Sequence, residues 1–187
     1  MPAFRIRHAF VLVFIACALL WPAAGDTVTA FVTPDREGCP HSSDLPDRGG
    51  RLEASSAVLC LLNQHRASHG LPALVKDPHL QAAAQAHAED MGRRNYHAHR
   101  DPDGVEPDQR IRRAGFEGRT TGENIAWGVG IDAAAARIVD AWMDSPGHRA
   151  NILRPSFDRV GTGIGYDAPE RVQGGLSPGV YVNNFGG

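Results

Sequence analysis

The sequence predicts an α+β fold in which helices come first and strands last. Between residues 52 and 152, apolar side chains recur every three or four positions, as on the buried face of a helix. After residue 159 the pattern changes to two β-type segments separated by a Gly/Pro/Gln loop. No strand–helix–strand alternation is present, which argues against a parallel α/β sheet.

The first 25 residues are predicted to be a secretory signal peptide, cleaved after Gly25. Two arginines open this segment, an apolar stretch runs from Ala9 to Leu20, and small residues precede the cleavage point. A lipoprotein signal with Cys17 as the modified residue is the alternative that the sequence fits less well. No later segment is long and apolar enough to span a membrane, so we expect a secreted protein without a transmembrane segment.

The charge of the chain argues against nucleic-acid binding. The 187 residues carry a formal charge of −2, and loss of the two signal-peptide arginines would make it −4, whereas nucleic-acid binders carry a basic face. Residues 26–51, rich in Pro, Gly, Ser and Asp, are predicted to form a flexible N-terminal arm. Residues 52–187 are long enough for one domain, which we expect to be a monomer.

Two cysteines, Cys39 and Cys60, remain after signal cleavage. An even number of cysteines in an exported chain favours a disulfide, which would tie the arm to the first helix and stabilise it by roughly 3 kcal/mol. Two unpaired thiols are the alternative.

The expected elements follow in chain order. A helix from about Leu52 ends near Gly70, and a second, capped by Asp77, carries His87 on its inner face as a hydrogen-bonded core residue. Residues 101–104 form a turn, and Pro107 opens a short helix. Asp132 is expected to cap a helix whose buried face is formed by Ile131, Ala135, Ile138, Val139 and Trp142. Residues 160–166 and 180–185 are the predicted paired strands.

The stretch from Trp142 to Leu153 contains a helix break at Pro146. Ser145 is suited to the N-cap of the next helix, and Pro146 to its first position. His148 then lies in the first turn, where the helix dipole disfavours an extra proton. A neutral imidazole can accept a hydrogen bond or bind a metal.

Four motifs in order give the chain a resemblance to a known family. His99 precedes an Asp-x-Asp-Gly turn, Gly122–Ile125 reads Gly-Glu-Asn-Ile, Trp142–Leu153 contains Ser-Pro-Gly-His-Arg-x-Asn-Ile-Leu, and Phe185-Gly186 closes the last strand. From about Leu59 to the C-terminus this order resembles the CAP superfamily of cysteine-rich secretory, antigen 5 and pathogenesis-related group 1 proteins. The resemblance implies a three-layer α-β-α sandwich with a central cleft.

The resemblance also implies a metal site. The family's cleft carries two histidines and two acidic residues that can hold a divalent cation, often zinc, and His99, His148 and Glu123 occupy three of these positions. Ser145 stands where many eukaryotic members have the second acid. Zinc accepts two imidazoles and one carboxylate with one position left open. His97, Asn124 and Ser145 are the expected supporting residues of the cleft, with His97 as a reserve ligand.

Each candidate also has a structural explanation. His148 could simply form a hydrogen bond within the fold, His99 could be a surface residue, and Glu123 could accept backbone N–H groups. Asn124 is expected to bond local backbone.

Three functions remain open. The first is a secreted CAP-domain protein whose cleft binds a divalent metal or a small or lipid ligand without turnover. The second is a hydrolase in the same cleft, using zinc or, less favoured, Ser145 as nucleophile. The third is an extracellular interaction module recognised through its loops. The sequence does not assign a catalytic residue.

Overall fold

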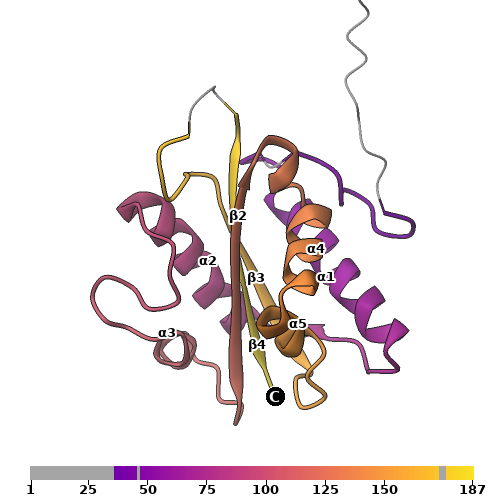
Figure 1. The fold of residues 1–187 in the computed structure, drawn as a ribbon. Helices are drawn as coiled ribbons and strands as arrows, with labels where there is room; N and C mark the ends of the chain where they lie inside the picture. The colour runs from indigo at the N-terminus through magenta and orange to yellow at the C-terminus, as the bar shows by residue number, and fades with distance from the viewer. Residues whose placement is uncertain (1–35, 46, 173–175) are drawn as a thin grey trace, which may run out of the picture. The chain divides into compact units, whose positions relative to one another are not determined.

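The computed structural model describes residues 36–45, 47–172 and 176–187. The predicted signal peptide and the start of the predicted arm lie outside the described residues. In Figure 1 the central sheet is seen edge-on, with helices on both faces. Helices α2 (Pro78–Arg94) and α3 (Pro107–Arg113) cover one face, and α1 (Arg51–Ser68), α4 (Ala135–Asp144) and α5 (Pro146–Ile152) lie on the other. The predicted α+β sandwich is confirmed.

The sheet has four strands in the order β1-β3-β4-β2. Strands β3 (Arg159–Gly165) and β4 (Pro178–Gly186) form the predicted antiparallel pair. On the other side of β4 lies β2 (Thr121–Val129), which is antiparallel to it and forms one edge of the sheet. The two-residue β1 (Val75–Lys76) pairs in parallel with β3 and forms the other edge. The sequence analysis assigned no strand to residues 121–129, and β2 is therefore an addition.

Helix α2 lies unusually close to β3 because three alternate residues of this strand are glycines. A Cβ atom added at Gly161, Gly163 or Gly165 would overlap the backbone of α2 around residues 80, 84 and 88. The helix backbone therefore rests directly on the strand, which side chains would prevent. The position of α2 in turn determines where the following loop begins.

On the opposite face, Arg66 of α1 is fully buried. Its guanidinium donates to the carbonyl oxygens of Pro72, Ile152, Arg154 and Phe157 at 2.7–3.1 Å. Buried charge is tolerated only when it is fully hydrogen-bonded. Here the acceptors include the carbonyl of the last α5 residue, so Arg66 holds the end of α5 against α1.

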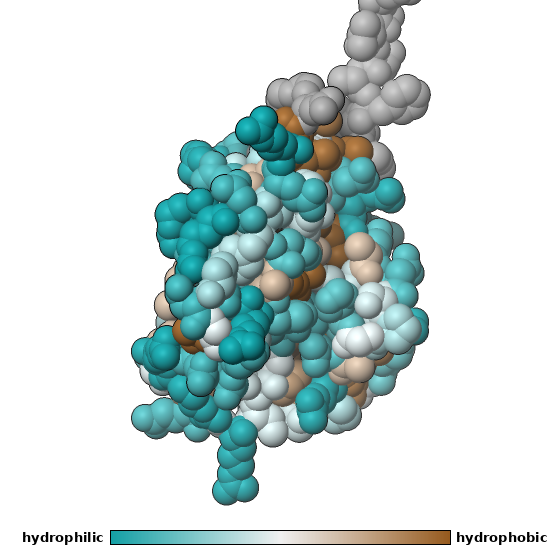
Figure 2. Space-filling model, turned by 60° about the vertical axis from the view of Figure 1, so that its left-hand side comes forward, coloured by the Kyte–Doolittle hydropathy of each residue, from teal (hydrophilic) through white to brown (hydrophobic). Residues whose placement is uncertain are grey.

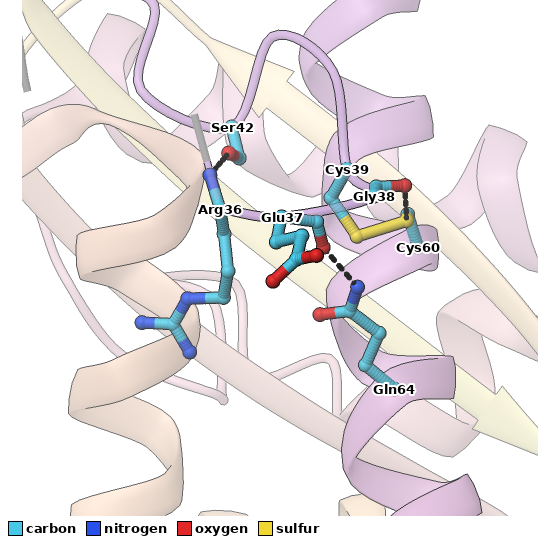
Figure 3. Close-up of a disulfide and its surroundings, with 7 residues drawn as sticks. All are labelled: Arg36, Glu37, Gly38, Cys39, Ser42, Cys60 and Gln64. Carbon is cyan, nitrogen blue, oxygen red and sulfur yellow. Dashed lines mark hydrogen bonds between the residues drawn. A yellow bond between two sulfur atoms is a disulfide. The ribbon is translucent and has the colours of Figure 1, made fainter. Parts of the chain in front are cut away.

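The described part of the predicted arm is attached to the domain. Cys39 and Cys60 form the predicted disulfide between this segment and α1 (Figure 3). Gln64 of α1 donates to the carbonyl of Glu37 at 2.7 Å, and Arg36 forms a salt bridge with Asp140 of α4 at 2.6 Å. Residues 36–45 are thereby connected to both α1 and α4.

Two details of the predicted helix starts are wrong. Asp132 does not cap α4, because it lies within a short 3-10 helix, η1 (Gly130–Ala133), and Ala134 occupies the N-cap of α4 without a side-chain bond. Ile131 is 41 % exposed and does not belong to the buried face. Ser145 is the N-cap residue of α5, as predicted, but its hydroxyl forms no capping bond.

The close approach of α2 to β3 predicts that Gly163→Ala is strongly destabilising. The new methyl group would meet the backbone of Ala84 and Gln85, so we expect the free energy of unfolding to fall by about 1–3 kcal/mol or more. Gly147→Ala is the control, because a Cβ there meets no atom within 4 Å and alanine favours a helix. Urea unfolding measures both, and equal stabilities would contradict the prediction.

Candidate functional site

The candidate site begins with Glu123 on the edge strand β2. Alternate β2 side chains point to opposite faces. Ile125 packs with Ala84 and Met91 of α2, which places Glu123, two residues earlier, on the same face. Only 2 % of the Glu123 side chain is exposed. A buried carboxylate is stable only with donors around it, so its partners define the site.

Both carboxylate oxygens of Glu123 have partners. His99 Nδ1 lies 2.8 Å from Oε1, and Arg110 of α3 donates to Oε2 at 2.9 Å and to Oε1 at 3.2 Å. In the amide orientation that satisfies both its polar atoms, Asn184 of β4 donates to Oε2 at 3.1 Å. The predicted approach of His99 to Glu123 is therefore present, and the bond leaves His99 Nε2 available to another partner.

The loop between α2 and α3 carries His99 into place. Helix α2 ends at Asn95, whose backbone is left-handed with φ 54°. The buried His87 of α2 bonds the carbonyl of Ala98 through Nε2 at 3.0 Å, as expected of a hydrogen-bonded core histidine. Burial lowers the pKa of His87, which keeps this imidazole neutral. Arg110 also donates to the carbonyl of His99 at 2.8 Å, so the loop is held from both sides.

His148 belongs to the layer on the opposite face of the sheet. It lies in the first turn of α5, and its backbone carbonyl accepts from Asn124 Nδ2 at 3.1 Å. Asn151 donates to Asn124 Oδ1 at 2.9 Å and to the carbonyl of Glu123 at 3.2 Å. Asn124 therefore connects β2 to α5 and does not bond local backbone, which corrects the expectation. Its contact with His148 is to the backbone carbonyl of that residue.

The charge of His99 affects the pKa of His148. Burial, and secondly the positive charge that His99 can carry, lower the pKa of His148. The pKa of His97 is also lowered, first by partial burial and then by the charges of His99 and His148. The charge of His99 thus acts on both His97 and His148. Within the described part of the chain, however, no three His, Cys, Asp or Glu side chains are grouped so that they could hold a metal ion.

The sequence analysis missed three residues of the site: Arg110, Asn151 and Asn184. A buried glutamate requires a cation, but Arg110, Arg112 and Arg113 were equivalent candidates in the sequence. Only the packing of α3 against β2 determines that Arg110 is the one that lies beside Glu123. Asn151 belongs to the Trp142–Leu153 stretch, so its side-chain contact with β2 could have been suspected. Ser145 makes no side-chain hydrogen bond to the cleft residues.

Comparison with known protein families identifies the family of this chain. The profile described as "CAP: Cysteine-rich secretory protein family" matches residues 59–185. The chain belongs to this family. The match contains all of the site residues described above, from His99 to Asn184.

Relatives of this CAP protein are found among bacterial proteins. The Bacillus subtilis protein YkwD is 39 % identical over 142 residues, which cover 75 % of the chain and 53 % of YkwD. The B. subtilis membrane protein YlbC is 33 % identical over 107 residues, which cover 57 % of the chain and 30 % of YlbC. The chain thus spans about half of YkwD and a third of YlbC.

Solved structures show the same fold. An extracellular SCP-domain protein from Bacillus anthracis has a TM-score of 0.61 and 26 % identity, with 73 % of this chain and 41 % of that chain covered. An outer surface protein from Borrelia burgdorferi has a TM-score of 0.60 and 23 % identity, with 72 % of this chain and 92 % of that chain covered. Within the described residues, no helix has the length and apolar character needed to cross a membrane.

The buried pair of Glu123 and Arg110 predicts a strong coupling between them. Arg110→Met would leave a buried carboxylate without its cation, and we expect a loss of about 3–5 kcal/mol in the free energy of unfolding. Adding Glu123→Gln to this variant should restore a large part of the loss. Arg93→Met is the control, because Arg93 is exposed and its salt bridge with Asp90 contributes little. Additive effects of the two site changes in denaturant unfolding would contradict the coupling.

Proposed function

We propose that this CAP protein is exported and binds a divalent cation, with zinc favoured, between His99 and His148, without catalytic turnover. The observation that carries the proposal is the bond between His99 Nδ1 and Glu123. A metal-binding histidine commonly donates its second ring N–H to a carboxylate, which fixes the ring and makes the other nitrogen a better ligand. His99 has this arrangement, with Nε2 left for the ion.

The donor set fits an open cation site. Two imidazoles suit zinc, and the remaining positions would be taken by water or by ligand oxygens. Glu123 fits as the partner of His99 and not as a ligand, because His99, Arg110 and Asn184 already bond its oxygens. The cation would therefore be held by fewer protein groups than the three that the sequence suggested.

Binding without turnover is preferred to hydrolysis because a hydrolase needs a free base near the attacking water. Glu123, the acid of the candidate site, is bonded to Arg110 on both oxygens. Its charge is thus already compensated. Ser145 lacks a hydrogen bond to a histidine, which a serine nucleophile would need.

Export is supported by three observations. The first residues fit a signal peptide. The Cys39–Cys60 disulfide is of a kind that persists in oxidising compartments. The B. anthracis structure with the same fold is described as an extracellular protein.

The cation proposal predicts a zinc-dependent rise in melting temperature. At about 100 times its Kd, zinc should add about 2.7 kcal/mol to the stability of the native protein. His99→Ala and His148→Ala should lose this gain. Glu123→Gln should weaken binding by about 10–100-fold, because it alters the partner of His99. His69→Ala is the control, because His69 is an exposed residue at the end of α1.

The zinc effect should also depend on pH. Metal binds neutral imidazole, and the pKa of His148 lies below its ordinary 6.5, so His148 remains a ligand at slightly acidic pH. The gain in melting temperature should therefore be present at neutral pH and disappear as the pH falls and the imidazoles become protonated. An equal zinc shift in His148→Ala and the unaltered protein would disprove the site.

A further inference from the structure

A cavity of about 310 Å³ lies between the outer edge of β2 and helix α4. Ala126 and Trp127 line it on the β2 side. The charged residues that line it from η1 and α4 are Asp132, Arg137, Asp140 and Asp144. None of these residues belongs to the candidate site around Glu123, so the cavity needs an explanation of its own.

Trp127 turns free backbone groups toward this edge. Thr120 and Gly187 exchange two backbone hydrogen bonds, at 3.0 and 3.2 Å, and the β2–β4 register continues without interruption to Val129↔Pro178. Because hydrogen-bonded pairs alternate along an antiparallel ladder, the backbone groups of odd-numbered β2 residues point away from β4. The N–H and the carbonyl of Trp127 are among these outward groups, and neither has a hydrogen-bond partner in the described part of the chain.

The open part of this edge is short. The outward carbonyls of Glu123 and Ile125 already accept from Asn151 and Trp142, at 3.2 Å each. After Val129 the chain leaves the strand and enters η1. Only a segment of two or three residues can therefore pair with β2, at Trp127.

The opposite wall of the cavity is acidic and already binds one guanidinium. Nη2 of Arg36 donates to both carboxylate oxygens of Asp140, each at 2.6 Å. Asp132 lies 3.6 Å from Arg137. Asp144 follows Asp140 by one helical turn on the same face of α4, and it forms no ion pair with any described residue. One carboxylate of this wall is therefore left for a cation from outside.

We propose that this cavity, the β2–α4 groove, binds a short extended segment of a partner protein that carries an arginine. One residue of the segment exchanges two backbone hydrogen bonds with Trp127, and an arginine next to that residue binds Asp144. The inference is independent of the cation site of the proposed function.

The directions of the side chains fit this arrangement. The indole of Trp127 packs with Ile125 and Val182, on the face of the sheet that α2 covers. A residue directly opposite Trp127 points its side chain to the same face. Its neighbours in the segment point to the other face, where α4 carries Asp144.

Charge and surface character favour a basic segment. Arg36 shows that an α4 carboxylate of this groove accepts a guanidinium, and hydrogen bonds between charged groups are the stronger ones. In the view of Figure 2 the α2 and α3 side of the molecule is mainly hydrophilic, which favours a short polar segment over a broad apolar partner surface.

The test is a titration of the isotope-labelled native protein with the peptide acetyl-Arg-Ala-Arg-amide, followed by amide NMR. An arginine flanks the central alanine on each side, so one of them faces α4 whichever way the peptide runs. We expect the amide of Trp127 to shift downfield and to exchange more slowly with solvent. The amide of Asn124, which bonds β4, should change little.

Two altered peptides separate the two kinds of contact. Citrulline in place of both arginines keeps their size and removes their charge. N-methylation of the central alanine removes the donor to the Trp127 carbonyl. Each change should weaken binding by about tenfold.

Matched variants of the protein locate the charge that is recognised. Asp144→Asn should weaken binding of the arginine peptide by about tenfold and leave the citrulline peptide unaffected. Asp108→Asn is the control, because Asp108 is an exposed residue of α3 and the variant loses the same charge. It should bind the arginine peptide as the unaltered protein does.

Each contrary result overturns a stated part of the proposal. Equal affinity for the citrulline peptide, or the same loss in Asp108→Asn as in Asp144→Asn, would show that Asp144 does not recognise the arginine. An unmoved Trp127 amide, or full affinity of the N-methylated peptide, would show that the segment does not pair with β2.

Discussion

The rest of the structure depends on the direct contact between the backbone of α2 and the glycine face of β3. With no side chains at Gly161, Gly163 and Gly165, the helix backbone lies where a Cβ of the strand would otherwise be. This brings the backbone N–H of Ala84 in α2 within 3.1 Å of the Asn184 side-chain oxygen, in the amide orientation in which Asn184 donates to Glu123. It also sets the end of α2, from which the loop with His99 must cross to the sheet edge. A single geometric constraint in the core therefore positions one wall of the site.

The buried carboxylate of Glu123 holds the residues around it in fixed positions. Its donors come from three different elements: the α2–α3 loop, helix α3 and strand β4. Losing one donor would leave charge without compensation, so each element is held in place by the same requirement. The bond to Glu123 uses Nδ1 of His99 and leaves Nε2 in a defined position.

Most of the fold could be predicted from the sequence because it follows periodic patterns. The helices at residues 51–68 and 78–94, the β3–β4 pair and the Cys39–Cys60 disulfide are confirmed. Strand β2 could not be predicted, because Glu123 and Asn124 put polar residues where a buried strand normally has apolar ones. Asp132 was misassigned because its side chain is suited to capping a helix. In the structure it lies in η1, and α4 begins at Ala135. The donors to Glu123 could not be identified from the sequence, because they are far apart along the chain.

The failure to predict β2 is informative, because sequence patterns of secondary structure are broken mainly where a functional site requires it. The unpaired backbone groups of an edge strand would ordinarily risk pairing with other strands. Here Trp142 and Asn151 each bond an outward carbonyl of β2, and both belong to the stretch that also presents His148. That stretch therefore occupies two outward carbonyls of β2, which a strand added at this edge would need.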